Sequence, residues 1–167
     1  MKNRKQISLF TLGIAFFVSS SFAALPQQSY LPSEMANKAV LAAVEQCKQD
    51  GYNISAAIVD KAGVVIAQLR ADNAGPHTID SSKNKAYTSA SLKEPTQKLA
   101  ELISKFPNIQ ALRDMNSQIL MLGGGFPIQI NGEVVGGLGV GGAPGVKLDE
   151  KCARAGLKVL KAEMYEK

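Results

Sequence analysis

The stretch Phe126-Pro-Ile-Gln-Ile-Asn-Gly-Glu-Val-Val-Gly-Gly-Leu-Gly-Val140 decides the fold of this chain. It places two apolar runs, 126–130 and 133–140, on either side of Asn131-Gly132. An Asn-Gly pair between apolar runs is the strongest local signal for a two-residue β-hairpin, because both residues adopt positive φ at low cost. The stretch therefore predicts two antiparallel strands that are neighbours in one sheet.

A second hairpin is predicted upstream of the first. The β-branched runs Ile54–Val59 and Val64–Leu69 flank the turn Asp60-Lys-Ala-Gly63, in which the glycine supplies a positive φ. The apolar run Gln118–Leu122 predicts one more strand. The sheet is thus expected to have five strands.

Helical patterns fill most of the remaining chain. Ser33 is the expected N-cap of a first helix that Gly51 ends, and Thr78 is expected to cap a second. Pro95 begins a further helix at its first turn, and Asp149 is expected to cap the last one. The order α-β-β-α-β-β-β-α predicts an α/β (α+β) domain, a mostly antiparallel five-stranded sheet with helices packed on it.

The first 23 residues have the three regions of a secretory signal peptide. Basic residues at 2–5 precede the apolar stretch Ile7–Val18, and Ser21-Phe-Ala23 is a small-x-small cleavage site. The apolar stretch is shorter than the roughly 20 residues that span a bilayer, so no stable membrane anchor is expected after cleavage. We expect residues 1–23 to be removed and residues 24–167 to form a single periplasmic or secreted domain.

The basic character of the chain comes mostly from this leader. Removing its three basic residues lowers the formal net charge from +5 to +2. The rest of the chain has no cluster of Lys and Arg interleaved with aromatic residues, so we expect no nucleic-acid partner.

The two cysteines, Cys47 and Cys152, are expected to form a disulfide. Export places them in a compartment that permits oxidation, and the first and last helices can lie side by side on one face of the sheet. The bridge would close a loop of about 105 residues, a constraint of roughly 4–5 kcal/mol in the chain-entropy description. The alternative is two buried free thiols.

Several short motifs are typical of nucleotide binding, catalysis or zinc binding, but their sequence context does not support these functions. Residues 137–142 spell G-x-G-x-x-G, but too little chain follows to complete a dinucleotide-binding unit, so these glycines are expected to let another backbone, a subunit or a flat ligand approach closely. Asp149-Glu150 reads as a helix-capping pair rather than a catalytic carboxylate pair. The single histidine, His77, lies near no nucleophile motif, and with two distant cysteines it lacks zinc-ligand spacing.

What remains is a set of side chains that can coordinate a haem iron, namely His77, the tyrosines and the methionines, chiefly Met115 and Met121. Each also has an ordinary structural interpretation. His77 reads equally as an exposed loop residue, and Tyr87 and Met121 as parts of the core.

An ordered set of short segments resembles the GlcG/HbpS family, and the likeness runs from about Ser33 to Leu160. The segments are Arg70-Ala-Asp72, Lys85-Ala-Tyr-Thr88, Pro95-Thr96, Gly124-Gly-Phe-Pro-Ile128, Gly132-Glu-Val-Val-Gly136, Gly139-Val140 and Asp149-Glu-Lys-Cys-Ala-Arg-Ala-Gly156. Two positions depart from the pattern. Ala71 stands where methionine is common, and Asn73 stands where glycine is common, although asparagine tolerates the left-handed backbone of such a turn.

The resemblance implies a profilin-like domain that forms homo-oligomers, in a family whose members bind haem and in some cases degrade it. The leading hypothesis is therefore an exported haem-binding protein, with haem degradation or sensing as variants that the residues do not separate. Whether the chain is an enzyme stays open. The alternative is a non-haem, oligomeric small-ligand-binding or accessory module. Subunit contacts are expected to include the glycine-rich strands.

His77 is the best candidate for an axial iron ligand under this hypothesis, because neutral imidazole is a common ligand of haem iron. Tyr87, Thr88 and Thr96 are neighbouring pocket positions or alternative ligands, since the resemblance leaves coordination by threonine open.

The leader generates a direct prediction. When the full chain is expressed in cells with an intact secretory pathway, the purified protein should begin at Ala24, because signal peptidase cuts after a small-x-small site. N-terminal sequencing and intact mass measure this. A secreted or periplasmic protein that retains residues 1–23 would contradict it.

Overall fold

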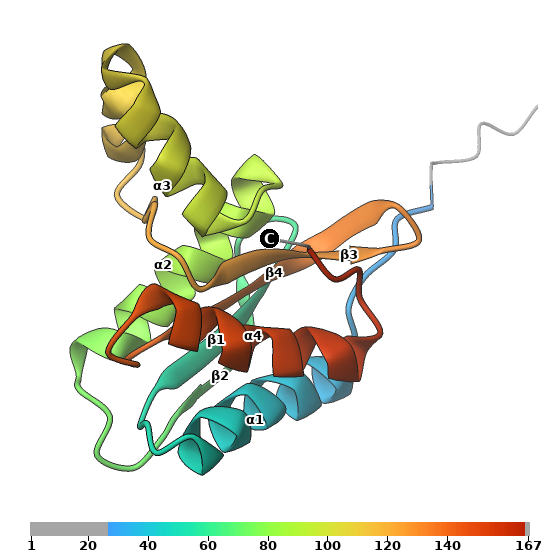
Figure 1. Cartoon of the computed structure of the whole chain (residues 1–167). Helices are drawn as coiled ribbons and strands as arrows, with labels where there is room; N and C mark the ends of the chain where they lie inside the picture. The colour runs from blue at the N-terminus through green and yellow to red at the C-terminus, as the bar shows by residue number, and fades with distance from the viewer. Residues whose placement is uncertain (1–26, 166–167) are drawn as a thin grey trace, which may run out of the picture.

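A computed structural model describes residues 27–165, so the predicted signal peptide lies outside the described residues. The elements follow one another along a single α+β domain (Figure 1). They are α1 Ser33–Gln49, β1 Ser55–Asp60, β2 Val65–Arg70, α2 His77–Leu92, α3 Thr96–Lys105, the 3-10 helix η1 Pro107–Asp114, β3 Gly125–Ile130, β4 Glu133–Gly141 and α4 Val146–Leu160. Within 27–165, no helix has the length and apolar character needed to cross a membrane.

The sheet has the strand order β2-β1-β4-β3, and every neighbouring pair is antiparallel. Both predicted hairpins are confirmed. Asn131 and Gly132 have φ of 52° and 77°, as a tight turn with two positive-φ residues requires, and Gly63 has φ of 80° between β1 and β2. Asn73, at the position where the family pattern has glycine, does adopt a left-handed φ of 62°.

The expectation of a fifth strand at Gln118–Leu122 is wrong, because the described sheet has four strands. The backbone of this segment pairs with side chains instead of with a strand. The N–H of Leu120 donates to the hydroxyl of Thr88 at 2.7 Å, and the carbonyl of Leu122 accepts from the hydroxyl of Thr96 at 2.7 Å. The segment Gln118–Leu122 is therefore a loop whose backbone is held by two threonine hydroxyls.

The helix starts also differ from the prediction in their details. Ser33 is the first residue of α1 rather than its N-cap, and α2 begins one residue before Thr78. The last helix begins at Val146, so Asp149 lies inside its first turn and does not cap it. Gly51, with φ of 88°, does end the first helix as expected.

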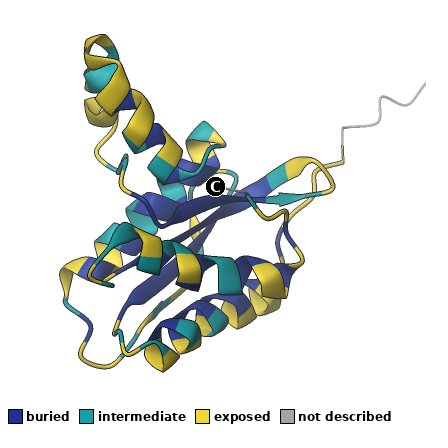
Figure 2. Cartoon of the chain, in the orientation of Figure 1, coloured by how far each residue is buried: buried dark blue, intermediate teal, exposed yellow. Residues whose placement is uncertain are grey.

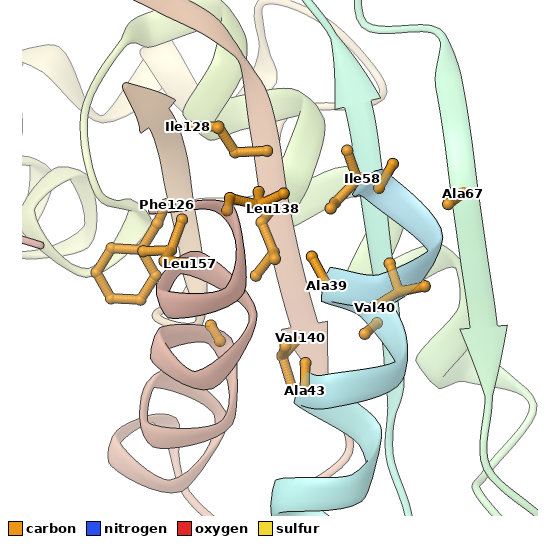
Figure 3. Packing of buried hydrophobic residues seen from close by; sticks show 14 of the residues in the cluster. Ala39, Val40, Ala43, Ile58, Ala67, Phe126, Ile128, Leu138, Val140 and Leu157 are labelled. Atoms are coloured by element: carbon orange, nitrogen blue, oxygen red, sulfur yellow. The ribbon is translucent and has the colours of Figure 1, made fainter. Parts of the chain in front are cut away.

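One face of the sheet is covered by α1 and α4, which lie side by side (Figure 1). Figure 3 shows Leu138 and Val140 of β4 directed toward these helices, where Ala39 and Ala43 of α1 meet them. The helices approach closely because α4 has a glycine at the contact. A Cβ built on Gly156 would lie 2.9 Å from the carbonyl oxygen of Ala39.

The expected disulfide joins these two helices. Cys47 of α1 and Cys152 of α4 are bonded across a Cα–Cα distance of 5.4 Å, and both residues are fully buried. This geometry lies within the ordinary range for a disulfide. The prediction of a bridge between the first and last helices is confirmed by the structure.

The other face of the sheet is covered by α2, which lies almost on the backbone of β4. A Cβ on Gly137 would lie 2.2 Å from the carbonyl oxygen of Ala86, and one on Gly139 would lie 2.1 Å from the carbonyl oxygen of Ser82. Residues 137, 139 and 141 alternate along the strand and share this face. Their glycines are thus the reason that a helix fits here, and the backbone that approaches them belongs to the same chain.

This packing bears on the expectation that subunit contacts include the glycine-rich strands. The glycine-rich face of β4 is buried beneath α2 of its own chain, so it does not offer bare backbone to another subunit. Exposed apolar side chains lie on several parts of the domain. One group of them lies on α3, η1 and the residues next to these helices, which extend away from the sheet as a largely exposed arm (Figure 2). The large exposed apolar side chains of this arm are Leu102, Phe106, Leu112 and Met115.

The close contact between α2 and β4 predicts the effect of one methyl group. Gly139→Ala should destabilise the domain by at least about 1–3 kcal/mol, because the added Cβ meets backbone atoms that cannot move independently. Gly145→Ala is the matched control, since a Cβ there meets nothing within 4 Å and should change stability by less than about 1 kcal/mol. Urea unfolding measures both variants, and equal effects would contradict this account of the glycine face.

Candidate functional site

A cleft of about 320 Å³ lies between α3, β3, α4 and the end of the described chain. Its volume is at the lower end of the range for small-molecule sites, roughly 300–1,000 Å³. The lining residues are Pro95, Gln97, Lys98, Glu101, Phe126, Val146, Lys147, Glu150, Arg154 and Tyr165. They combine apolar and aromatic side chains with charged groups, which suits a ligand that has an apolar body and a polar end.

Phe126 and Tyr165 form the aromatic wall of the cleft. Phe126 is only 1% exposed, its ring centroid is 6.0 Å from that of Tyr165, and the two planes meet at 28°. The guanidinium carbon of Arg154 lies 4.8 Å from the centroid of Phe126, close enough for a cation–π interaction. The wall therefore combines two neighbouring aromatic rings with a cation that lies against one of them, Phe126.

The segment after α4 runs beside β3 and places Tyr165 in the cleft (Figure 1). The N–H of Glu163 donates to the carbonyl of Gln129 at 2.8 Å, and the Tyr165 hydroxyl donates to Oε1 of Gln129 at 3.0 Å. Arg154 donates to the carbonyl of Tyr165. Burial, with the nearby charges of Glu163 and Glu94, raises the pKa of Tyr165 to about 12. Its hydroxyl therefore stays protonated at neutral pH.

The two predicted threonine positions meet at the loop before β3, behind the cleft. Thr96 lies between two lining residues, is fully buried, and its hydroxyl accepts from the N–H of Gly125 at 2.9 Å while donating to the Leu122 carbonyl. The fully buried Thr88 hydroxyl donates to the Asn84 carbonyl at 2.7 Å and accepts from Leu120. Both hydroxyls thus have backbone partners that fix the loop.

The structure places the other two predicted residues elsewhere. His77 is exposed at the first position of α2, about 16 Å along the helix from Thr88 at 1.5 Å per residue, and it does not line the cleft. No other residue of 27–165 donates or accepts a hydrogen bond at its ring. Tyr87 is half-buried, and its ring covers Gly63 in the turn between β1 and β2. Of the predicted set, only Thr88 and Thr96 come together.

A buried ion pair behind the cleft was missed by the sequence analysis. The ammonium of Lys85 lies 2.8 Å from Oδ2 of Asp149 and donates to the carbonyl of Val140 at 2.9 Å. Oδ1 of Asp149 accepts from the N–H of Ala143 at 3.0 Å. Burial raises the pKa of the Asp149 carboxyl, while Lys85 and the Ala143 N–H act in the opposite direction.

The signals for the missed residues were present in the sequence. Lys85 begins one of the quoted segments, and Asp149 and Arg154 stand in another, but nothing in their spacing shows that they are buried together or face a cleft. Over residues 27–165, no group of three or more His, Cys, Asp or Glu side chains is placed to hold a metal ion.

The fold and the cleft define a small α+β domain with a partly cationic candidate binding site. Residues 31–158 match the family model described as haem degrading protein HbpS-like, and the chain belongs to this family. The resemblance seen in the sequence is thereby confirmed.

Solved structures show the same fold. A crystal structure of a double mutant of HbpS from Streptomyces reticuli superposes with a TM-score of 0.77 at 41% identity, covering 89% of this chain and 99% of that one. A structure of a PduOC–haem complex superposes with a TM-score of 0.75, covering 83% of this chain and 100% of that one. At 23% identity, the second likeness concerns the fold alone.

Two bacterial sequences are also similar. The GlcG protein of Escherichia coli K12 is 27% identical over 110 residues, which cover 66% of this chain and 80% of that protein. An uncharacterised 15.0 kDa protein of Citrobacter freundii is 35% identical over 86 residues, which cover 51% of this chain and 61% of that protein.

The buried ion pair predicts an asymmetric response to pH. Asp149→Asn leaves the Lys85 cation buried without its partner and should cost about 3–5 kcal/mol. Lys85→Met should cost a similar amount near pH 7, but less near pH 5. The reason is that burial raises the pKa of Asp149 above its unfolded value, so the folded state gains stability as the pH falls through the raised pKa.

The double variant, Lys85→Met with Asp149→Asn, removes both charges and should recover much of the loss. Urea unfolding of all four proteins at the two pH values measures this. Equal pH dependence in the two single variants would contradict the proposed origin of the effect.

Proposed function

We propose that the protein is exported and binds haem. The observation that carries this proposal is the cleft, which joins an aromatic wall to cationic side chains in a chain of the HbpS-like family. Haem is a flat, largely apolar ring with two carboxylate-bearing arms, and it needs both features. PduOC, a protein with the same fold, forms a complex with haem.

The cleft would hold one edge of the ring rather than all of it. Its volume of about 320 Å³ is too small for the whole macrocycle, so the rest of the ring would lie outside the cleft. Phe126, Tyr165 and Pro95 would contact the ring, and the bound haem would supply an iron centre. Degradation would also require an open iron position for oxygen and a source of electrons.

We propose His77 as the iron ligand, on the grounds of the available donors. Because His77 does not line the cleft, it would have to meet the part of the haem that lies outside the cleft. The cleft is lined by no histidine, cysteine or methionine, and the Tyr165 hydroxyl already donates to Oε1 of Gln129. Thr88 and Thr96 already use their hydroxyls on the backbone. The exposed imidazole of His77 has no such commitment within the described chain, which favours it as a donor.

We further propose that the protein is a homo-oligomer, with a second copy covering the arm formed by α3 and η1. Phe106 and Met115 are 44% and 54% exposed on this arm. Clusters of exposed apolar side chains commonly mark contacts between proteins. The arm adjoins the cleft, because Lys98 and Glu101 of α3 line it, so a second copy there would also lie near the bound ring.

Haem titration of the mature protein tests the function. A saturable, stoichiometric shift of the Soret band is expected for wild type, and His77→Ala should change the band position and weaken binding by at least about tenfold. Featureless, unsaturable binding by wild type would overturn haem binding. A His77→Ala protein with wild-type band and affinity would exclude His77 as the ligand.

The threonines need matched variants because they also hold the loop. Thr88→Val and Thr96→Val each leave backbone groups of the loop without their partner, whereas Thr88→Ser and Thr96→Ser keep the hydroxyl. Coordination by threonine would be indicated if a valine variant that is folded and oligomeric lost the Soret shift while its serine counterpart kept it.

A non-haem function is the second candidate, and the size of the cleft favours it. A cleft of about 320 Å³ matches the size of a small aromatic acid better than that of haem. Saturable binding of such an acid, together with unsaturable haem binding, would support this reading.

The oligomer is tested by light scattering at micromolar concentration. The mature protein should have a mass that is a multiple of one chain, and Phe106→Asp should shift it to smaller species, because a charge on the arm cannot be buried cheaply. Val64→Asp is the matched control, since Val64 is 61% exposed on the turn before β2, away from the arm. A monomeric wild type would contradict the proposal.

A further inference from the structure

We propose that the cleft recognises a carboxylate, and that Arg154 is the residue that determines this specificity. The inference rests on the proposed function and deepens it. The ligand class is a flat apolar molecule with a carboxylate at one edge, which includes the propionates of haem and small aromatic acids.

Arg154 is held in position before any ligand binds. Its guanidinium lies 4.8 Å from the ring centroid of Phe126 and donates to the carbonyl of Tyr165, so it is fixed between the wall of the cleft and the segment after α4. A guanidinium has five N–H donors in a planar fork, and this contact uses one nitrogen. Donors therefore remain for a ligand.

Arg154 also lacks a counter-ion within the described chain. It is half-buried, yet no carboxylate of residues 27–165 lies within ion-pair distance of it. Partial burial makes a charge more expensive to leave unpaired, and arginine binds carboxylates in a bidentate geometry. A ligand carboxylate would supply the missing partner.

The remaining charges of the cleft are consistent with this assignment. Lys147 lines the cleft at the start of α4, where the helix dipole also favours an anion. Lys98 is paired with Glu94 at 2.9 Å, and the amide of Gln97 donates to Glu101 at 2.8 Å. Because Lys98 is paired and the Arg154 cation lies beside the aromatic wall, Arg154 is the cation that we expect to decide binding.

The experiment compares haem with haem dimethyl ester, in which both propionates are methylated, by titration against the mature protein. Wild type should bind the acid about tenfold to a hundredfold more tightly than the ester, the range expected for hydrogen bonds to a charged group. Arg154→Met should abolish this preference, and Arg154→Lys should keep part of it. The ratio of affinities is the readout, because a purely structural defect weakens both ligands alike.

Lys158→Met is the matched control, since Lys158 is exposed on the same helix and does not line the cleft. It should keep the wild-type ratio. If Arg154→Met does not fold, Lys147→Met replaces it and should lower the ratio, because Lys147 contributes a second positive charge. Wild type that binds both ligands equally overturns this inference alone, and wild type that binds neither overturns the proposed function. An unchanged ratio in Arg154→Met removes Arg154 from the site.

Discussion

The close approach of α2 to β4 is the contact on which the other packing depends. Gly137 and Gly139 let the helix backbone lie against the strand, so the intervening Leu138 can point to the opposite face and form the core with α1 and α4. A larger residue at either glycine would lift α2 away from the sheet. Lys85 of α2 would then no longer reach Asp149, and α4 would lose the ion pair that holds its first turn against α2. One steric constraint on a strand thus positions helices on both faces.

Buried polar contacts then fix the positions of α2, α4 and the loop before β3 relative to one another. The Lys85–Asp149 pair joins α2 to the start of α4, while the hydroxyls of Thr88 and Thr96 hold the loop that leads into β3. Each group is buried and each has partners, so the layer behind the cleft is specified by directed bonds rather than by apolar packing alone. The cleft is therefore formed mainly by side chains that rest on a rigid polar base.

The elements that were predictable depend on local chemistry. The turn at Asn131-Gly132 follows from the φ preferences of these two residues. The pairing of Cys47 with Cys152 follows from two helices that share one face of the sheet. The segment Gln118–Leu122 was mistaken for a strand because an apolar run does not reveal whether its backbone will find a strand or a pair of threonines. The cleft was not predictable, since its residues come from α3, β3, α4 and the chain end, and only the fold brings them together.

Three residues within one six-residue stretch of helix α4 make three different kinds of contact. Asp149 faces the buried lysine, Cys152 faces α1, and Arg154 faces the cleft, so these residues leave little of the helix surface without a partner. Substitutions in this helix should therefore be tolerated best at exposed positions such as Lys158. The arm formed by α3 and η1 has the opposite character, because its tip beyond the cleft contacts little of the domain. To change the binding partner of the domain by design, one would therefore replace residues at the tip of this arm and leave α4 unchanged.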